Sequence, residues 1–302
     1  MAVVGPWCAV VAVFVCASRF RHPAIFVACA LAIGTLHHHL AVIAHQSAHY
    51  RLFKTRWLND LAGRIASYPL GVSLQTYRII HRTHHNHLYE AIDPDLAQIA
   101  GYPRGRLYLV RKLAKDLAGI TVVKNYLYFF GRQARRPVSD SNDETSLSLR
   151  RAARIDQRMM IASNVVLFGV LAFSGAWKAY LVLWVLPLAT WFQMLLRLRA
   201  VCEHGAPTDT SSPWTAARTN VGPFWVMGVL FPLHMNFHIE HHLYPSIPHY
   251  RLPECHREMV KAGLFSDERR AESISFWKTL GKIFAPPRQA AATAPEAASL
   301  SK

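Results

Sequence analysis

Acidic residues are scarce in this sequence. Its 302 residues include 18 Asp and Glu against 34 Lys and Arg, which gives a formal net charge of +16 with neutral histidine. Cysteine is also sparse, and the five cysteines form no CxxC pair, which argues against a disulfide scaffold or a zinc ribbon. The motifs HExxH, GxGxxG and HPGG are absent, so the sequence gives no sign of a zinc protease helix, a dinucleotide-binding fold or a fused cytochrome b5 haem site.

Long uncharged runs, by contrast, are present. Asp, Glu, Lys and Arg are missing from residues 2–17, 23–44, 159–177 and 179–196. A helix needs about 20 mostly apolar residues to cross a bilayer, and two of the runs meet this length comfortably while two are marginal. We predict an all-α integral membrane protein with four transmembrane helices in two hairpins. The first run lacks a charged leader and a small-residue cleavage site, which favours a retained helix over a signal peptide.

The basic residues fall almost entirely outside these runs and their short turns. Nineteen Lys and Arg lie between residues 51 and 158, twelve lie between residues 197 and 302, and three lie in the two short turns. Cytoplasmic segments of membrane proteins carry such an excess of Lys and Arg. We therefore place residues 45–158 and 197–284 in a helical cytoplasmic cap. Topology and anionic lipid headgroups explain the charge better than nucleic-acid binding does.

The remaining segments complete one membrane domain over residues 1–284. Val221–Phe237 is also uncharged, but a fifth crossing would put the following residues on the opposite side, so we interpret this run as re-entrant or interfacial. Residues 285–302 are rich in Ala, Pro and Ser and are predicted to be a disordered tail. The expected location is a membrane, most simply a bacterial inner membrane, with the histidine-rich cap facing the cytoplasm.

Thirteen of the 17 histidines lie in three short stretches. The first is HHH at residues 37–39 followed by HQSAH at 45–49, the second is HRTHHNH at 81–87, and the third is HMNFHIEHH at 234–242. Residues three or four apart share one face of a helix. The eight histidines that can align in this way are His45, His49, His81, His84, His85, His238, His241 and His242. His87 lies about 240° around from His81 and is expected to point away.

Eight aligned imidazoles are more than one zinc ion binds, since zinc takes four ligands. They suit a pair of metal ions, and imidazole is a good ligand for iron, copper, zinc or nickel.

These three motifs resemble the histidine boxes of the membrane fatty-acid desaturases and their relatives, the alkane hydroxylases and carotenoid ketolases. The resemblance extends to HHNHLYEAIDPD at residues 84–95 and HIEHHLYPSIPHYRLP at residues 238–253, and covers about residues 36–258. It implies a further ligand, His204 in the sequence Glu203-His204-Gly205, which makes nine. One departure is Gln46, which stands where many relatives have an acid.

The resemblance also implies an activity. Two iron ions would use O2 to abstract hydrogen from an unactivated C–H bond of a lipid acyl chain and introduce a double bond. A hydroxylase or ketolase acting on a fatty acid, a hydrocarbon or a carotenoid is the alternative on the same scaffold. A divalent-metal transporter is disfavoured, because the histidine clusters sit at helix ends rather than at mid-membrane. A separate ferredoxin, rubredoxin or cytochrome b5 is expected to supply electrons by docking on the basic face.

Several polar residues are candidates for supporting roles. Asp93, Asp95, Glu203 and Glu240 are predicted to hold ligand imidazoles through their free N–H groups, although a loop or helix-capping role is equally open for the two aspartates. His234 precedes His238 by four residues, and a structural or supporting role is favoured over a ligand role. His38 lies inside an apolar run and is predicted to line a substrate channel.

Overall fold

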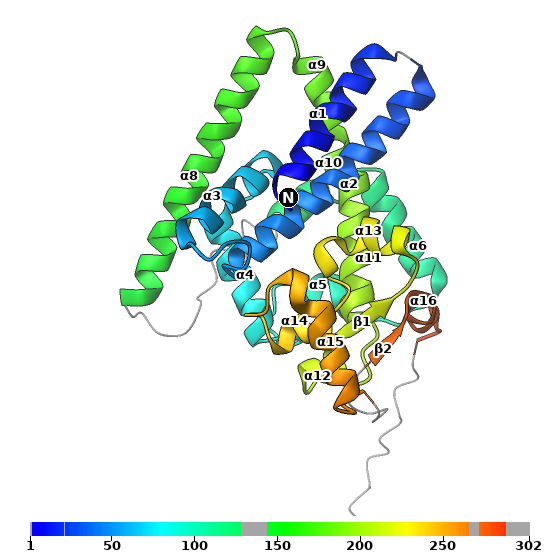
Figure 1. Cartoon of the computed structure of the whole chain (residues 1–302). Helices are drawn as coiled ribbons and strands as arrows, with labels where there is room; N and C mark the ends of the chain where they lie inside the picture. Colours follow the sequence, from blue (N-terminus) through cyan, green and yellow to red (C-terminus); the bar gives the residue numbers. More distant parts are fainter. Residues whose placement is uncertain (1, 21, 128–143, 266–271, 288–302) are drawn as a thin grey trace, which may run out of the picture.

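The computed structural model describes residues 2–20, 22–127, 144–265 and 272–287, and it is mostly helical (Figure 1). Residues 128–143 and nearly all of the predicted tail lie outside the described residues. Long helices occupy one end of the molecule, and shorter helices with a small sheet occupy the other (Figure 1).

Two antiparallel helical arms form the first end. The first arm pairs α1 (Val4–Arg19) with α2 (Pro23–Ala48). The second arm joins α8 (Glu144–Phe173) to a returning series, which consists of α9 (Trp177–Tyr180), the π-helical turn η4 (Leu181–Val185), α10 (Leu186–Ala189) and α11 (Trp191–His204). Within the described residues, three helices are long and apolar enough to span a membrane: 23–48, 147–173 and 177–204. At 16 residues α1 is shorter, so the structure confirms three candidate spans rather than four.

The returning series is interrupted because Pro187 has no amide hydrogen and its ring crowds the preceding turn. The π-helical turn precedes this proline, and Thr190 departs from helical geometry with φ −121° and ψ −89°. The Gln193 side chain compensates by donating from Nε2 to the Leu188 carbonyl over 3.1 Å. After this break α11 runs without interruption to His204.

Helix α8 begins 15 residues earlier than the predicted span. Its lower turns are charged, but they contain no helix breaker and pack on the cap. Buried Asp156 accepts hydrogen bonds from Arg64 Nε at 2.7 Å, Tyr68 Oη at 2.8 Å and Ser73 Oγ at 2.8 Å. Beyond this anchor, Val165, Val166, Val170 and Phe173 are exposed, which suits contact with lipid.

The cap is built from two stretches of chain. The first contains α3 (Arg56–Ser67), η1 (Tyr68–Leu70), α4 (Leu74–Asn86), α5 (Leu96–Ile99), α6 (Arg106–Leu117) and α7 (Val122–Tyr126). The second contains α12 (Pro213–Ala216), β1 (Arg218–Val221), α13 (Phe224–Leu230), η5 (Pro232–His234), α14 (His238–Leu243), η6 (His249–Arg251), α15 (Leu252–Lys261), β2 (Glu272–Ser275) and α16 (Phe276–Phe284). The uncharged run 221–237 is therefore divided among the end of β1, α13 and η5, and it is not one continuous helix.

The small sheet departs from the all-α prediction. Strands β1 and β2 pair in parallel, from Arg218 opposite Glu272 to Val221 opposite Ser275. The first three side chains of β1, Arg218, Thr219 and Asn220, are buried and polar, and they hold the cap together through hydrogen bonds. Thr219 Oγ1 donates to Glu240 over 2.6 Å, and Asn220 receives a hydrogen bond of 2.6 Å from Thr279. A four-residue strand of this composition carries no alternating apolar pattern that would reveal it in the sequence.

Candidate metal centre

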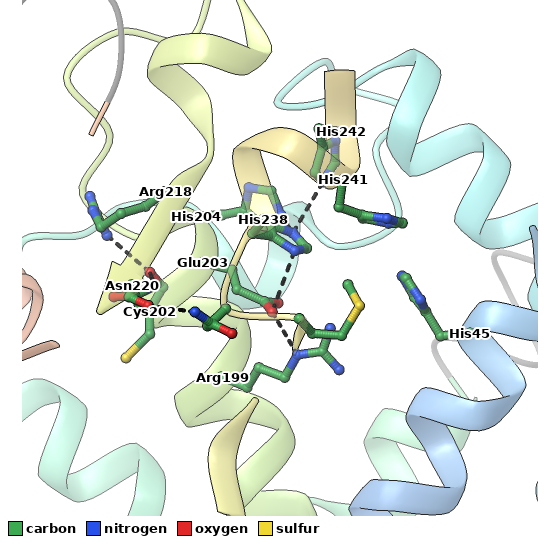
Figure 2. Close-up of polar contacts among 12 residues, drawn as sticks. His45, Arg199, Cys202, Glu203, His204, Arg218, Asn220, His238, His241 and His242 are labelled. Carbon is green, nitrogen blue, oxygen red and sulfur yellow. Dashed lines mark hydrogen bonds and ion pairs between the residues drawn. The ribbon is translucent and has the colours of Figure 1, made fainter. Parts of the chain in front are cut away.

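The nine predicted ligands meet where four helices converge. The last turn of α2 supplies His45, and its C-terminal cap is His49. Helix α4 contributes the second box, α11 ends on His204, and the short helix α14 carries the third box. Figure 2 shows His45 on α2 pointing toward His241 of α14, with His204 and His238 close together.

The five-histidine group consists of His45, His49, His81, His85 and His241, one ligand nitrogen of each lying within 4.8 Å of all the others. The closest separations join Nε2 atoms. They are 2.8 Å between His49 and His81, 3.0 Å between His81 and His85, and 3.0 Å between His85 and His241.

The four-histidine group consists of His84, His204, His238 and His242 and meets the same criterion. Its Nε2 separations are 2.8 Å for His204 and His238, 3.1 Å for His238 and His242, and 3.3 Å for His84 and His204. The second and third boxes therefore divide between the groups: His84 of the HRTHH box and both His238 and His242 of the HIEHH box join His204, whereas His81, His85 and His241 join the first box.

These separations fit metal coordination. With metal–nitrogen bonds of about 2.0–2.1 Å, neighbouring ligand nitrogens lie roughly 3.0 Å apart at right angles and roughly 3.4 Å apart in a tetrahedron. His45 Nε2 is buried and has no hydrogen-bond partner among the described residues, and an orphaned buried nitrogen is costly unless something binds it. The two groups can thus hold one metal ion each.

Electrostatics favour the metal-binding form of most of these rings. Burial first, and repulsion between neighbouring imidazoles second, lower the pKa values of His81, His85, His238, His241 and His242. Burial, with Arg51 and Arg78 adding to it, lowers the pKa of His49 to about 4. Rings with lowered pKa values are neutral at pH 7, and only neutral imidazole binds metal.

His84 behaves differently because two aspartates face it. Burial opposes its protonation, but Asp95 and Asp93 outweigh that effect and raise its pKa. The ring Nδ1 lies 2.9 Å from Asp93 Oδ1 and 3.5 Å from Asp95 Oδ2. A carboxylate on the outer nitrogen fixes the tautomer that points Nε2 at a metal. The aspartates therefore lie where the sequence analysis expected them.

Two other members of the four-histidine group, His204 and His238, also have contacts on their outer nitrogens. His204 Nδ1 lies 3.0 Å from the Ala216 carbonyl. His238 Nδ1 lies 3.4 Å from Glu203 Oε1, and that carboxylate receives a hydrogen bond of 2.7 Å from Arg199 Nε (Figure 2). The sequence analysis placed Glu203 near the ligands but did not foresee its arginine, although the i, i+4 spacing within α11 signals such a pair.

Glu240 and His234 do not hold the ligand imidazoles. Glu240 lies on the opposite face of α14 from His241 and His242, where it contacts Thr219 and, over 2.5 Å, His256 Nδ1. His234 is exposed, and its ring lies against His249 at a centroid distance of 6.3 Å. The residue adopts a left-handed φ of 59° after the break at Leu233, so it does not share the helical face that its spacing suggested.

Two further residues of the boxes, His87 and Gln46, are not members of either group. His87 turns outward and places Nδ1 2.9 Å from Glu90. Gln46, the departure from the family pattern, places its amide nitrogen 3.1 Å from Met235 Sδ and 3.4 Å from His45 Nδ1. An uncharged amide thus occupies the position beside the His45 ring.

A buried arginine holds the loop that follows His204, and the sequence analysis missed it. Arg218 donates from Nη1 to the carbonyls of Cys202 and Gly205, at 3.2 and 3.1 Å, and from Nη2 to that of Ala206 at 3.2 Å. Asn220 donates a further hydrogen bond to the Cys202 carbonyl over 3.1 Å (Figure 2). The C-terminal carbonyls of α11 are thereby satisfied, which fixes the end of the helix that carries His204.

A cavity of about 1300 Å³, its open mouth included, reaches the metal centre. Part of its wall comes from ligands of both groups, including His45, His81 and His84. Another part is apolar and comes from α2, η1, α4 and α11, with Ala41, Leu70, Val72, Ile80 and Leu196. Among the described residues, His38 is not on this wall. Its side chain is fully buried beside Phe192. The cavity therefore runs along a different face of α2, the one that carries Ala41 and His45, and not along His38 as predicted.

Comparison with known proteins relates this chain to desaturases. Residues 21–271 match the family model described as fatty acid desaturase. An sn-1 acyl-lipid omega-3 desaturase (ferredoxin) of Nostoc sp. is 25% identical over 82% of this chain and 70% of its own length. The dihydrorhizobitoxine desaturase of Bradyrhizobium elkanii is 28% identical over 75% and 65%, and an sn-1 oleoyl-lipid 12-desaturase of Synechocystis sp. is 26% identical over 71% and 62%.

Proposed function

The chain belongs to the fatty acid desaturase family, and we propose that it is an integral membrane, O2-dependent di-iron enzyme that introduces a double bond into a lipid acyl chain. It is an enzyme of the fatty-acid desaturase type. The observation that supports the proposal most strongly is the division of nine histidines into groups of five and four, each with the spacing of a metal site.

The proposed reaction removes two hydrogen atoms from adjacent carbons. One O2, two electrons and two protons are consumed, and two water molecules leave with all four hydrogens. The pair of irons supplies the activation of O2 that hydrogen abstraction from an unactivated C–H bond requires. The five- and four-histidine groups would each hold one iron. Asp93, Asp95, Ala216 and Glu203 keep the outer nitrogens engaged, so that the inner nitrogens stay in place through turnover.

The cavity is the proposed binding site for the acyl chain. Its apolar wall excludes water from the reacting carbons and positions the chain beside the ligands of both groups, and positioning is the main contribution of the protein to chemistry of this kind. The relatives include acyl-lipid desaturases, which supports a lipid-linked chain as the substrate.

A separate carrier is the proposed source of electrons. The net charge of +16 favours an acidic partner, because complementary charge steers association. One relative carries ferredoxin in its name and another, from Arabidopsis thaliana, carries cytochrome b5. We favour a ferredoxin-type donor, with rubredoxin and cytochrome b5 as the other classes to test.

The proposed topology has four crossings, both termini and the metal centre on the cytoplasmic side, and a bacterial inner membrane as the location. With the native cysteines replaced, a single cysteine at exposed Ser174, in the α8–α9 turn, should react with a membrane-impermeant reagent added to intact cells. A cysteine in place of exposed Glu90, beside the second box, should react only after the cells are opened. Labelling of both sites from the same side would refute this arrangement.

Product analysis tests the activity. The full chain is expressed with a ferredoxin and its reductase in a host of defined lipid composition, and the acyl chains are examined by mass spectrometry. A product two mass units lighter than its precursor, absent from a His241→Ala variant, is expected. A product 16 units heavier would show the hydroxylase alternative, and unchanged lipids would count against both.

A further inference from the structure

One face of α11 lines the cavity and is more polar than a hydrocarbon channel needs. From the metal centre outward, this face presents His204, Ala200, Arg197, Leu196 and Gln193 to the cavity, with the spacing of adjacent turns. At 1.5 Å per residue, Arg197 lies about 10 Å and Gln193 about 16 Å along the helix from His204. The ion-paired Arg199 and Glu203 also line the cavity close to the ligands, and the polar positions farther out on α11 are Arg197 and Gln193.

Two elements outside α11 complete this polar end. Arg197 forms a buried two-contact ion pair with Asp116 of α6, one contact joining Nη2 and Oδ1 over 3.0 Å. Gln193 Oε1 accepts a hydrogen bond of 3.1 Å from Asn125 Nδ2 of α7, and Asn125 also lines the cavity. The polar end is therefore defined by Gln193, Arg197 and Asn125.

Burying these polar groups costs free energy that a site for a purely hydrocarbon substrate would not recover. Removing an ion pair from water costs several kcal/mol per ion before its attraction is counted, and Arg197 of this pair lies on the wall of a mainly apolar cavity. The two contacts to Asp116 use two of the five N–H groups of Arg197, so donors remain for another acceptor. A ligand that brings a hydrogen-bond acceptor to this end would use them.

The balance of charges on the cavity wall indicates which kind of hydrogen-bond acceptor would bind at this polar end. Each arginine on the wall already has an acidic partner: Arg197 has Asp116, and Arg199 has Glu203. Neither provides an uncompensated positive charge for a carboxylate or a phosphate. A neutral oxygen, such as the carbonyl of an ester, fits these donors without leaving a buried net charge.

We propose that Gln193, Arg197 and Asn125 bind the neutral carbonyl of an esterified acyl chain and thereby set the carbon that reacts. This inference rests on the proposed function and specifies its substrate as an ester rather than a free acid or an alkane. An extended chain advances about 1.2 Å per bond, so 10 to 16 Å corresponds to roughly 8 to 13 bonds between the carbonyl and the metal centre. The double bond should then be counted from the carbonyl, not from the methyl end.

Binding measurements test the recognition directly. The full chain, loaded with zinc as a redox-inert metal, is held in detergent micelles with radiolabelled methyl octadecanoate. Unlabelled methyl octadecanoate, octadecanoate and octadecane compete with it. We expect the ester to bind about tenfold more tightly than the alkane, the effect of one buried hydrogen bond, and more tightly than the carboxylate. Gln193→Leu and Asn125→Leu should each reduce the preference for the ester while alkane binding persists.

The control is Leu198→Met, since Leu198 packs on the opposite side of α11 in a separate core cluster and should leave the preference unchanged. Equal affinity for ester and alkane in the unmodified chain would overturn the proposal, and so would tighter binding of the carboxylate. If Gln193→Leu and Asn125→Leu weakened the binding of all three probes equally, Gln193 and Asn125 would have a structural role instead. Absence of binding by every probe would remove the cavity as the substrate site.

Turnover on a series of esters that differ by two carbons distinguishes failure of this inference from failure of the proposed function. A double bond at a constant distance from the carbonyl supports the inference. A double bond at a constant distance from the methyl end contradicts it and leaves desaturation intact. No unsaturated product from any ester would count against the proposed function itself.

Discussion

Asp93 Oδ1 lies 2.9 Å from Nδ1 of His84, and both side chains are almost completely buried. The carboxylate is held in turn, because its Oδ2 accepts from the Tyr89 amide at 2.9 Å and its Oδ1 accepts from the Asp95 amide at 2.9 Å. The loop after α4 thus fixes the direction in which His84 points, and it does so without contacting the metal position itself.

Asp93→Asn should weaken the four-histidine site. The amide keeps the shape but loses the charge that makes the His84 ring a better ligand, and loss of such a partner typically costs 10- to 100-fold in metal affinity. Metal titration of the chelated full chain measures this effect. Glu90→Gln is the matched control, because Glu90 contacts His87 rather than a ligand. Unchanged affinity in Asp93→Asn would show that the contact is structural only.

Single ligand substitutions should separate the two sites. His241→Ala removes a member of the five-histidine group and His242→Ala removes a member of the four-histidine group. His242→Ala should lower the metal content from about two ions to about one per chain, because only three ligands remain at its site, whereas His241→Ala leaves four ligands and should weaken metal binding at its site less. Elemental analysis of purified protein measures the ratio.

Turnover provides the second measurement for these variants. Both should be inactive, and His84→Ala should be inactive as well, whereas His87→Ala should keep both metals and its activity because its ring turns outward. Full activity in His84→Ala, or loss of metal in His87→Ala, would contradict the ligand assignment.

His204 has its own test. If it binds metal, His204→Ala should lower metal occupancy and activity together while the protein still inserts into membranes. Gly205→Ala should act on the same residue indirectly. A methyl group at Gly205 would lie 2.5 Å from the Val201 carbonyl oxygen, so the end of α11 must shift, at a cost of about 1–3 kcal/mol.

Metal content and thermal stability should therefore both fall in Gly205→Ala. Gly281→Ala is the control, because a methyl group there meets nothing within 4 Å in α16 and alanine favours helix. Normal metal content in both His204→Ala and Gly205→Ala would leave eight ligands.

Stability without metal should depend on pH. His49 has a folded pKa of about 4 because of burial and its neighbouring arginines, against about 6.5 in an unfolded chain. Above pH 6.5 the ring is neutral in both states and has no effect. Below it, the unfolded chain binds a proton that the folded chain does not, so the free energy of unfolding falls by about 1.4 kcal/mol per pH unit until about pH 4.

Thermal unfolding of the chelated protein should therefore occur at lower temperature at pH 5 than at pH 7. Bound zinc should raise the unfolding temperature at both pH values without removing the difference, because the folded rings carry no proton with zinc bound while the unfolded chain still gains protons below pH 6.5. A melting temperature of the chelated protein that does not change between these pH values would contradict the assignment of neutral, buried rings.

The sequence by itself determined the three histidine boxes, because i, i+3 and i+4 spacing on a helix puts rings on one face whatever the helix packs against. It also indicated the long apolar helices, since their composition follows from the need to face an apolar environment.

Only the tertiary structure decided how the histidines divide. His84 and His85 are adjacent on α4, yet they belong to different groups, because His84 meets His204 at the end of α11 whereas His85 lies with His45 and His49 at the end of α2. The roles of Glu240 and His234 were also undecidable locally, since the break at Leu233 and the strand β1 redirect both side chains. Buried polar partners such as Asp116 for Arg197 join residues 81 positions apart, and no local pattern in the chain specifies a contact of that kind.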